Sequence, residues 1–377
     1  MDTAHRQAVD FVSPHRFSAT LCLLAVVVLL ASGAAQAQDR EFNLTIEERV
    51  IDVAPGLSYQ VFAFNGQVPG PLIHVREGDD VTVNVVNNTT LPHTIHWHGL
   101  YQRNNWKNDG VPGVTQKAIE PGDTFTYHWK AEKTGSLWYH CHVNVSEHVG
   151  IRGMWGPLIV DPAKPTKLEK KVTKDVIMML SSWDSDYAEK LGNGGGPRDV
   201  PNYFSINGRA FPMTQPIHVK EGDVVRLRLF GAGAEIHSIH THGHDMLVTH
   251  KDGRPLTAPY YVDTLLIGPG ERYDAIMEMD NPGLFMVHDH VDPQVTNNGK
   301  HGGGVMTMFV YDGIEPAVEG DPHGALPDND PDFYYSESMK KPYGLHSNAH
   351  FAGVPLEAKG RAERRRGGHE TTTESDD

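Results

Sequence analysis

Short apolar runs closed by turn signals fill the middle of the chain. Val, Ile, Thr and Tyr recur within these runs, and pairs such as Pro69-Gly70, Pro121-Gly122 and Pro269-Gly270 separate them. Runs of β-branched and aromatic residues bounded by turn residues are typical of strands. Long helical periodicity is absent from this part of the sequence. The pattern therefore predicts an all-β protein.

The same order of motifs occurs twice along the chain. Residues 65–99 read NGQVPGPLIHVREGDDVTVNVVNNTTLPHTIHWHG, and residues 207–243 read NGRAFPMTQPIHVKEGDVVRLRLFGAGAEIHSIHTHG. Further on, IEPGDTFTYHW leads to GSLWYHCHV, and IGPGERYDAIM leads to GLFMVHDHV. A repeat of roughly 120–140 residues made of short strands indicates two homologous Greek-key β-sandwich domains. We expect these domains at residues 43–163 and 172–315.

The two ends of the chain depart from this pattern. Residues 1–37 carry early basic residues, then an apolar stretch from Leu21 to Ala31, and they end in Ala35-Gln36-Ala37. These features predict a secretory signal peptide cleaved after Ala37, with an apolar core too short to span a membrane. We therefore expect a periplasmic or secreted mature protein without a membrane span. Residues 316–377 show little apolar pattern and predict an extended arm and a disordered tail.

Charge and cysteine content narrow the possible functions. The 377 residues carry a formal net charge of −15, which argues against a nucleic-acid partner. Of the two cysteines, Cys22 would leave with the signal peptide, so the mature chain has no internal disulfide. A free thiol that binds no ligand is prone to oxidation outside the cytoplasm. Cys141 is therefore either a buried structural residue or a ligand.

Each half of the chain supplies two His-x-His pairs. Residues i and i+2 of a strand point to the same face, so each pair can direct two imidazoles at one site. A single histidine in a strand is usually structural, but four pairs at corresponding positions indicate an all-nitrogen transition-metal site, which suits copper, zinc or iron. The pairs are His96/His98, His140/His142, His240/His242 and His288/His290.

A second set of candidate ligands occurs only in the first half. Two histidines, a thiolate and a weak thioether form the trigonal blue-copper set, and His93, Cys141, His148 and Met154 follow one another in that order. The alternative for Met154 is an ordinary core methionine. In the second half Asp289 stands where Cys141 would be, so we interpret His237 and His301 there as remnants or structural residues.

The motifs HTIHWHG, YHCHVNVSEHVGIRGM, HSIHTHG and VHDH resemble the four copper motifs of multicopper oxidases, the laccase-like enzymes. The resemblance covers residues 43–315 and is closest to oxidases with two cupredoxin domains and one type 1 copper in the first. It implies four coppers per subunit and a homotrimer, with each three-copper cluster between one subunit's first domain and the next subunit's second domain.

The resemblance also implies a role for each ligand. The type 1 copper would be held by His93, Cys141, His148 and Met154. The type 2 copper would be held by His96 and His240, and the type 3 pair by His98, His140, His142, His242, His288 and His290. Asp109 resembles the acidic residue near the type 2 copper that delivers protons, although an Asp-Gly turn is the alternative.

The implied activity is one-electron oxidation of a reducing substrate coupled to four-electron reduction of dioxygen to water. Electrons would enter through an exposed edge of His93 or His148. The electron donor could be a phenol, an aromatic amine, a metal ion or a redox protein. One alternative is a copper nitrite reductase, which has a single type 2 copper and an Asp where His96 stands. Another is an electron carrier or copper-storage protein, which would leave eight histidines without a role.

Overall fold

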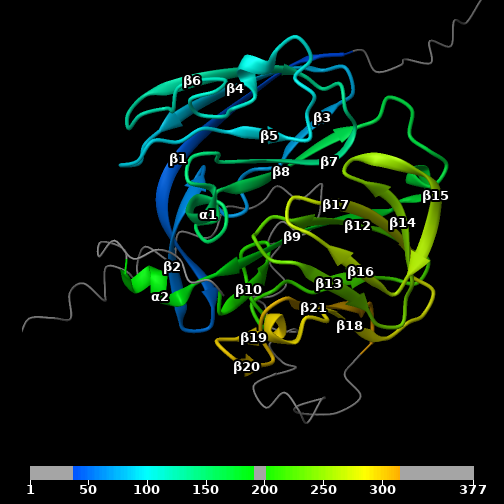
Figure 1. Ribbon diagram of the computed structural model, residues 1–377. Helices are drawn as coiled ribbons and strands as arrows, with labels where there is room; N and C mark the ends of the chain where they lie inside the picture. The colour runs from blue at the N-terminus through cyan, green and yellow to red at the C-terminus, as the bar shows by residue number, and fades with distance from the viewer. Residues whose placement is uncertain (1–36, 191–200, 315–377) are drawn as a thin grey trace, which may run out of the picture. The chain divides into compact units, whose positions relative to one another are not determined.

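The computed structural model describes residues 37–190 and 201–314. Nearly all regular structure in these residues is β (Figure 1), so the all-β prediction is confirmed. The expectations for the signal peptide and for the tail at 316–377 lie outside the described residues, apart from Ala37. Within the described part of the chain, no helix is both long and apolar enough to cross a bilayer.

Two four-stranded sheets form the first half of the chain. One has the order β2-β1-β4-β6, and the other has the order β3-β8-β7-β5. In β4, Val81, Val83 and Val85 are buried while the residues between them are partly exposed, as expected of a strand with one face on the core. The strands are β1 (Asp39–Ala54), β2 (Leu57–Phe64), β3 (Ile73–Arg76), β4 (Asp80–Asn87), β5 (His96–His98), β6 (Thr124–Lys130), β7 (Gly135–His140) and β8 (Trp155–Asp161).

Two larger sheets form the second half. Their orders are β15-β14-β17-β12-β9-β10-β19-β20 and β11-β21-β18-β13-β16. The strands are β9 (Lys174–Trp183), β10 (Tyr203–Ile206), β11 (Ile217–Val219), β12 (Val224–Gly231), β13 (His237–Thr241), β14 (Met246–Lys251), β15 (Arg254–Val262), β16 (Thr264–Ile267), β17 (Arg272–Glu278), β18 (Leu284–Asp289), β19 (Thr296–Asn297), β20 (Lys300–His301) and β21 (Met306–Tyr311).

The strands that carry the histidine pairs have the same neighbours in both halves. β5 pairs with β7, and β7 pairs with β8; β13 pairs with β18, and β18 pairs with β21. In each half the pairing sets a histidine of one motif opposite a histidine of the other, His96 opposite His140 and His240 opposite His288. Both sheets therefore gather their four histidines at one end.

Buried polar contacts join the two halves. Ser136 of β7 donates a hydrogen bond of 2.5 Å to the Asp274 carboxylate of β17. Arg228 of β12 donates to the Ser136 hydroxyl at 2.9 Å and pairs with Asp274 at 3.3 Å. Gly135 has a φ of +99°, and a Cβ there would lie 2.6 Å from the backbone of Gly253. The close approach of the two backbones therefore requires glycine at position 135.

Candidate metal centre

Cys141 lies at the centre of a buried sulfur–nitrogen cluster. Its Sγ is 3.6 Å from Nδ1 of His93 and 3.4 Å from Nδ1 of His148, and the three potential ligand atoms all lie within 4.8 Å of one another. The one-turn helix α1 (Val145–His148) brings His148 back towards Cys141. The backbone of Met154 accepts a hydrogen bond from Cys141 N–H at 3.1 Å and donates one to the His148 carbonyl at 3.0 Å. The Met154 side chain is fully buried in the same core.

A hydrogen bond fixes which nitrogen of His93 faces Cys141. The Thr89 hydroxyl donates to Asn87 Oδ1 at 2.8 Å and lies 2.9 Å from His93 Nε2. Because that hydroxyl donates its hydrogen to Asn87, Nε2–H of His93 is the donor to Thr89. The lone pair of a neutral His93 is then on Nδ1, which points at the sulfur, and this is the form that binds a metal.

Burial controls the protonation of this cluster. It lowers the pKa of His93 to about 3 and that of His148 to about 4, and the positive charge of Arg152 acts in the same direction on both. Burial also raises the pKa of the Cys141 thiol to about 11. Both imidazoles are therefore neutral at ordinary pH, while the thiol must release its proton when a metal binds.

Three imidazoles of the first half form a second cluster next to this one. Potential ligand atoms of His96, His98 and His140 lie within 4.8 Å of one another, and the His142 ring centroid is 5.4 Å from that of His96. Burial lowers the pKa of His98 to about 2 and that of His140 to about 3, and it also lowers that of His96. Because His140 and His142 flank Cys141, one tripeptide belongs to both clusters.

Backbone carbonyls orient the imidazoles of this cluster. Nδ1 of His96 donates to the Asp109 carbonyl at 2.7 Å, and Nδ1 of His140 donates to the Cys141 carbonyl at 2.8 Å. A carbonyl only accepts, so Nδ1 carries the proton and Nε2 keeps its lone pair for a metal. The Asp109 carboxylate lies 3.5 Å from the same His96 nitrogen. Asp109 is thus beside the cluster, as the motif predicts.

The second half repeats this arrangement with four other histidines. Nδ1 of His240 donates to the Asp263 carbonyl at 2.8 Å, and Nδ1 of His288 donates to the Asp289 carbonyl at 2.9 Å. His242 Nε2 and His288 Nε2 are 3.0 Å apart, and the ring centroids of His240 and His290 are 5.3 Å apart. Within the described residues, each of the ring contacts between these histidines joins two members of the same half.

A buried histidine–carboxylate hydrogen bond occupies the position in the second half that corresponds to the Cys141 cluster. Asp289 Oδ2 lies 2.7 Å from Nδ1 of His237, and both side chains are fully buried. The other carboxylate oxygen accepts from the backbone N–H groups of Ser238 and Val291, each at 2.9 Å. His237 is therefore a structural residue that helps to hold β13 against β18, while His301 is exposed on β20.

Two features of the site were not foreseen from the sequence. His93 is 0% and His148 is 2% exposed, so the expected exposed imidazole edge is wrong. Phe62 covers both rings, with centroid distances of 4.8 and 4.9 Å. The other feature is Arg152, whose guanidinium is buried beside the cluster; a basic residue within the CHVNVSEHVGIRGM loop was the available signal.

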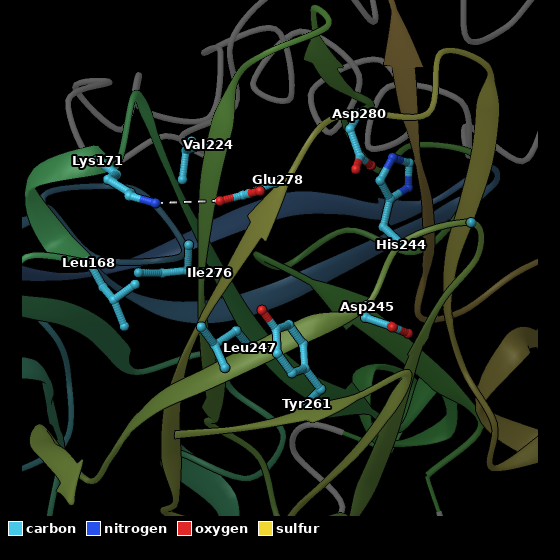
Figure 2. Close-up of a pocket in the computed structure, with 11 residues that line it drawn as sticks. Leu168, Lys171, Val224, His244, Asp245, Leu247, Tyr261, Ile276, Glu278 and Asp280 are labelled. Carbon is cyan, nitrogen blue, oxygen red and sulfur yellow. Dashed lines mark ion pairs between the residues drawn. The ribbon is translucent and has the colours of Figure 1, made fainter. Parts of the chain in front are cut away.

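A pocket of about 470 Å³ lies in the second half, next to the segment that follows β13. Gly243 and His244, which directly follow His242, line one side, and Figure 2 shows the Lys171–Glu278 ion pair, 3.7 Å long, on the other. His244 Nε2 accepts from the Tyr311 hydroxyl at 2.7 Å, and its Nδ1 donates to the His242 carbonyl at 3.2 Å. His244 thus holds the backbone of His242 through this hydrogen bond.

Comparison with known proteins agrees with this arrangement. Two family models, both described as multicopper oxidase, match residues 45–165 and 174–313. A structure titled multicopper oxidase mgLAC is 63% identical with a TM-score of 0.74, and the alignment covers 84% of this chain and 99% of that one. A blue copper oxidase from Nitrosomonas europaea is 59% identical with the same coverage and TM-score.

Longer relatives match over part of their length. Laccase-2 of Botryotinia fuckeliana is 35% identical over 260 residues, which is 63% of this chain and 43% of that protein. The chain spans less than half the length of the curated relatives that it matches.

Proposed function

Because the chain belongs to the multicopper oxidase family, we propose that it oxidises a reducing substrate one electron at a time and reduces dioxygen to water. The observation that carries this proposal is the shared tripeptide His140-Cys141-His142. Its cysteine lies between His93 and His148, and its histidines lie with His96 and His98. An electron received at the first cluster has a covalent path to the second that lies within one tripeptide. A carrier or storage protein does not need such a path.

The donor atoms fit copper. A buried thiol, two neutral imidazoles and a nearby methionine suit a blue copper, and clusters of imidazoles suit the oxygen-reducing coppers. We propose four coppers per subunit. The type 1 ligands are His93, Cys141, His148 and Met154; the type 2 ligands are His96 and His240; the type 3 ligands are His98, His140, His142, His242, His288 and His290. Copper bound there would supply reversible one-electron transfer.

The chain's own groups prepare these sites. Hydrogen bonds from Nδ1 to backbone carbonyls hold the imidazoles in the tautomer that leaves Nε2 free. We assign proton delivery to the Asp109 carboxylate. It lies 3.5 Å from His96 Nδ1 and is 31% exposed, so it can exchange protons with water and hold one close to the site of oxygen reduction.

We further propose a homotrimer. His290 is exposed, His96, His98 and His142 are partly exposed, and each half holds four histidines, so a partner subunit could approach either set. Cyclic closure of one such contact between the first domain of one subunit and the second domain of the next would join four histidines with four. The domain ranges 43–163 and 172–315 belong to this proposal.

The export route and the donor are also proposals. The leader-like residues 1–37 favour a signal peptide and a periplasmic or secreted enzyme. A phenol, an aromatic amine or a metal ion would be the donor. Nitrite reduction is the less favoured alternative, because His96 stands where a nitrite reductase has an aspartate and because the family matches are to oxidases.

Oxygen uptake measured together with donor oxidation tests the function. We expect four one-electron donor molecules oxidised per dioxygen consumed, without accumulation of peroxide, and loss of this turnover in Cys141→Ser. A chain that consumes no oxygen with any donor but reduces nitrite would contradict the proposal.

A further inference from the structure

A buried positive charge lies behind the aromatic ring that covers the Cys141 cluster. Arg152 is 2% exposed, and its guanidinium carbon lies 4.0 Å from the ring centroid of Phe62. The Arg152 carbonyl also accepts a hydrogen bond of 3.0 Å from the Phe62 N–H. The side chain and the backbone of Arg152 therefore both contact Phe62.

Phe62 connects this charge to both imidazoles of the cluster. Its ring meets those of His93 and His148 edge to face, with centroid distances of 4.8 and 4.9 Å. The guanidinium carbon is therefore at most about 9 Å from both imidazole centroids, a separation at which charges still interact through a protein interior. The buried Phe62 ring lies between them, and an apolar ring screens charges less than water does.

The counter-ion balances this charge incompletely. Glu147 lies 3.2 Å from Arg152, but its side chain is 17% exposed while that of Arg152 is 3% exposed. Solvent therefore screens the carboxylate more than the guanidinium. Among the described residues, the buried Nε of Arg152 has no hydrogen-bond partner. Burying a cation in this way costs folding free energy, so stability alone does not explain it.

We infer that Arg152 sets the reduction potential of the copper held by Cys141, acting through Phe62 as a positioning residue and not as a catalytic one. The inference rests on the proposed function. When Cu²⁺ takes one electron from the reducing substrate and becomes Cu⁺, the charge of the site falls by one. A fixed positive charge nearby favours the less positive state and so raises the potential.

The test is a potentiometric titration of the blue visible band in the copper-loaded protein. Arg152→Gln should favour Cu²⁺ over Cu⁺ by about tenfold, which lowers a one-electron potential by about 59 mV. Arg152→Lys keeps the charge and should move the potential less than Arg152→Gln does. Lys130→Gln removes a cation that is 51% exposed in its pair with Asp80, and it should leave the potential unchanged.

Glu147→Gln provides the background for a second measurement. Glu147 also acts directly on the neighbouring His148, so its removal alone should raise the potential. If Arg152→Gln does not fold or load copper, the double variant Glu147→Gln with Arg152→Gln removes both charges of the pair; its potential should lie below that of Glu147→Gln, and equal potentials overturn the inference. An unchanged potential in Arg152→Gln with its blue band intact also overturns it.

These outcomes separate this inference from the proposed function. A wild-type protein that shows no blue band after copper loading contradicts both. If the wild-type protein has a blue band and the Arg152 substitutions leave its potential unchanged, the inference alone is contradicted.

Discussion

At the scale of single residues, backbone carbonyls decide how the histidines can act. Four of the eight imidazoles, those of His96, His140, His240 and His288, donate from Nδ1 to a carbonyl oxygen. Neutral imidazoles with a fixed tautomer need little reorganisation when a metal binds. The His-x-His spacing predicted which side chains gather, but not these bonds, because the carbonyls of Asp109 and Asp263 come from loops whose course is set by packing.

Asp109 offers a prediction at this scale. Asp109→Asn keeps the backbone carbonyl that orients His96 and removes the carboxylate. Copper content should therefore be unchanged, while kcat for oxygen reduction should fall by about a hundredfold, as is common for loss of a positioned proton donor. Copper analysis with steady-state oxygen uptake checks this. Asp80→Asn, at an exposed carboxylate, serves as the control, and an unaltered kcat in Asp109→Asn would rule out the proton role.

The contacts that could not be predicted from the sequence have one physical cause in common. The His237–Asp289 pair and the contact of Arg152 with Phe62 join positions far apart in the chain. Local spacing carries no signal for such contacts. The presence of Asp289 at the position of a cysteine did indicate that the second half lacks a thiolate, and the buried hydrogen bond to His237 gives the carboxylate a structural role.

At the scale of elements, alternation and turn signals predicted the strands that build the cores. They served less well for β15, where most residues are exposed on both sides. A strand at the edge of a sheet lacks the buried face that produces a clear alternation. The Cys141 motif and the VHDH motif lie at the ends of the core strands β7 and β18, whereas HWH is itself the three-residue strand β5.

The loop that carries Asp109 gives a second prediction. Gly110 has a φ of +85°, and a Cβ there would lie 1.8 Å from the Ile95 carbonyl oxygen. Gly110→Ala should therefore displace the Asp109 carbonyl from His96 and weaken copper binding at the histidine cluster by about 10–100-fold, while the blue band stays.

A matched glycine in the same loop provides the control. Gly113 also has a positive φ, +75°, but a Cβ there would meet nothing within 4 Å. Gly113→Ala should strain the backbone at residue 113 without displacing any neighbouring atom. Copper retention against a chelator distinguishes the two variants, and equal loss in both would refute the role of the Gly110 contact.

The junction between the halves gives a third prediction. Asp274→Ala leaves the buried Arg228 guanidinium, whose side chain is 2% exposed, without one of its carboxylate partners. Removing one partner of a buried pair costs about 3–5 kcal/mol of unfolding free energy. Asp80→Ala breaks an exposed pair with Lys130 and should cost about 1 kcal/mol or less. Denaturant unfolding at equal protein concentration checks both, and similar losses would argue against a junction held by this pair.

At the scale of the whole molecule, the proposed oxygen-reducing centre needs eight histidines that act in two sets of four. If these sets meet between subunits, assembly and copper loading must be coupled. Dilution until the trimer dissociates should release the three cluster coppers, while the blue copper, whose ligands all lie in one half of one chain, should stay. Analytical ultracentrifugation with copper analysis follows both; a monomer that keeps all its copper would contradict the subunit-interface arrangement.

Copper stoichiometry, measured together with absorption and electron paramagnetic resonance on the copper-loaded chain, tests the central claim most directly. The account predicts four coppers per chain, an intense blue band, a near-ultraviolet shoulder from a coupled pair, and resonance from only two of the four. Two coppers per chain, both visible by resonance and without the shoulder, would contradict the three-copper cluster and make nitrite the first substrate to try.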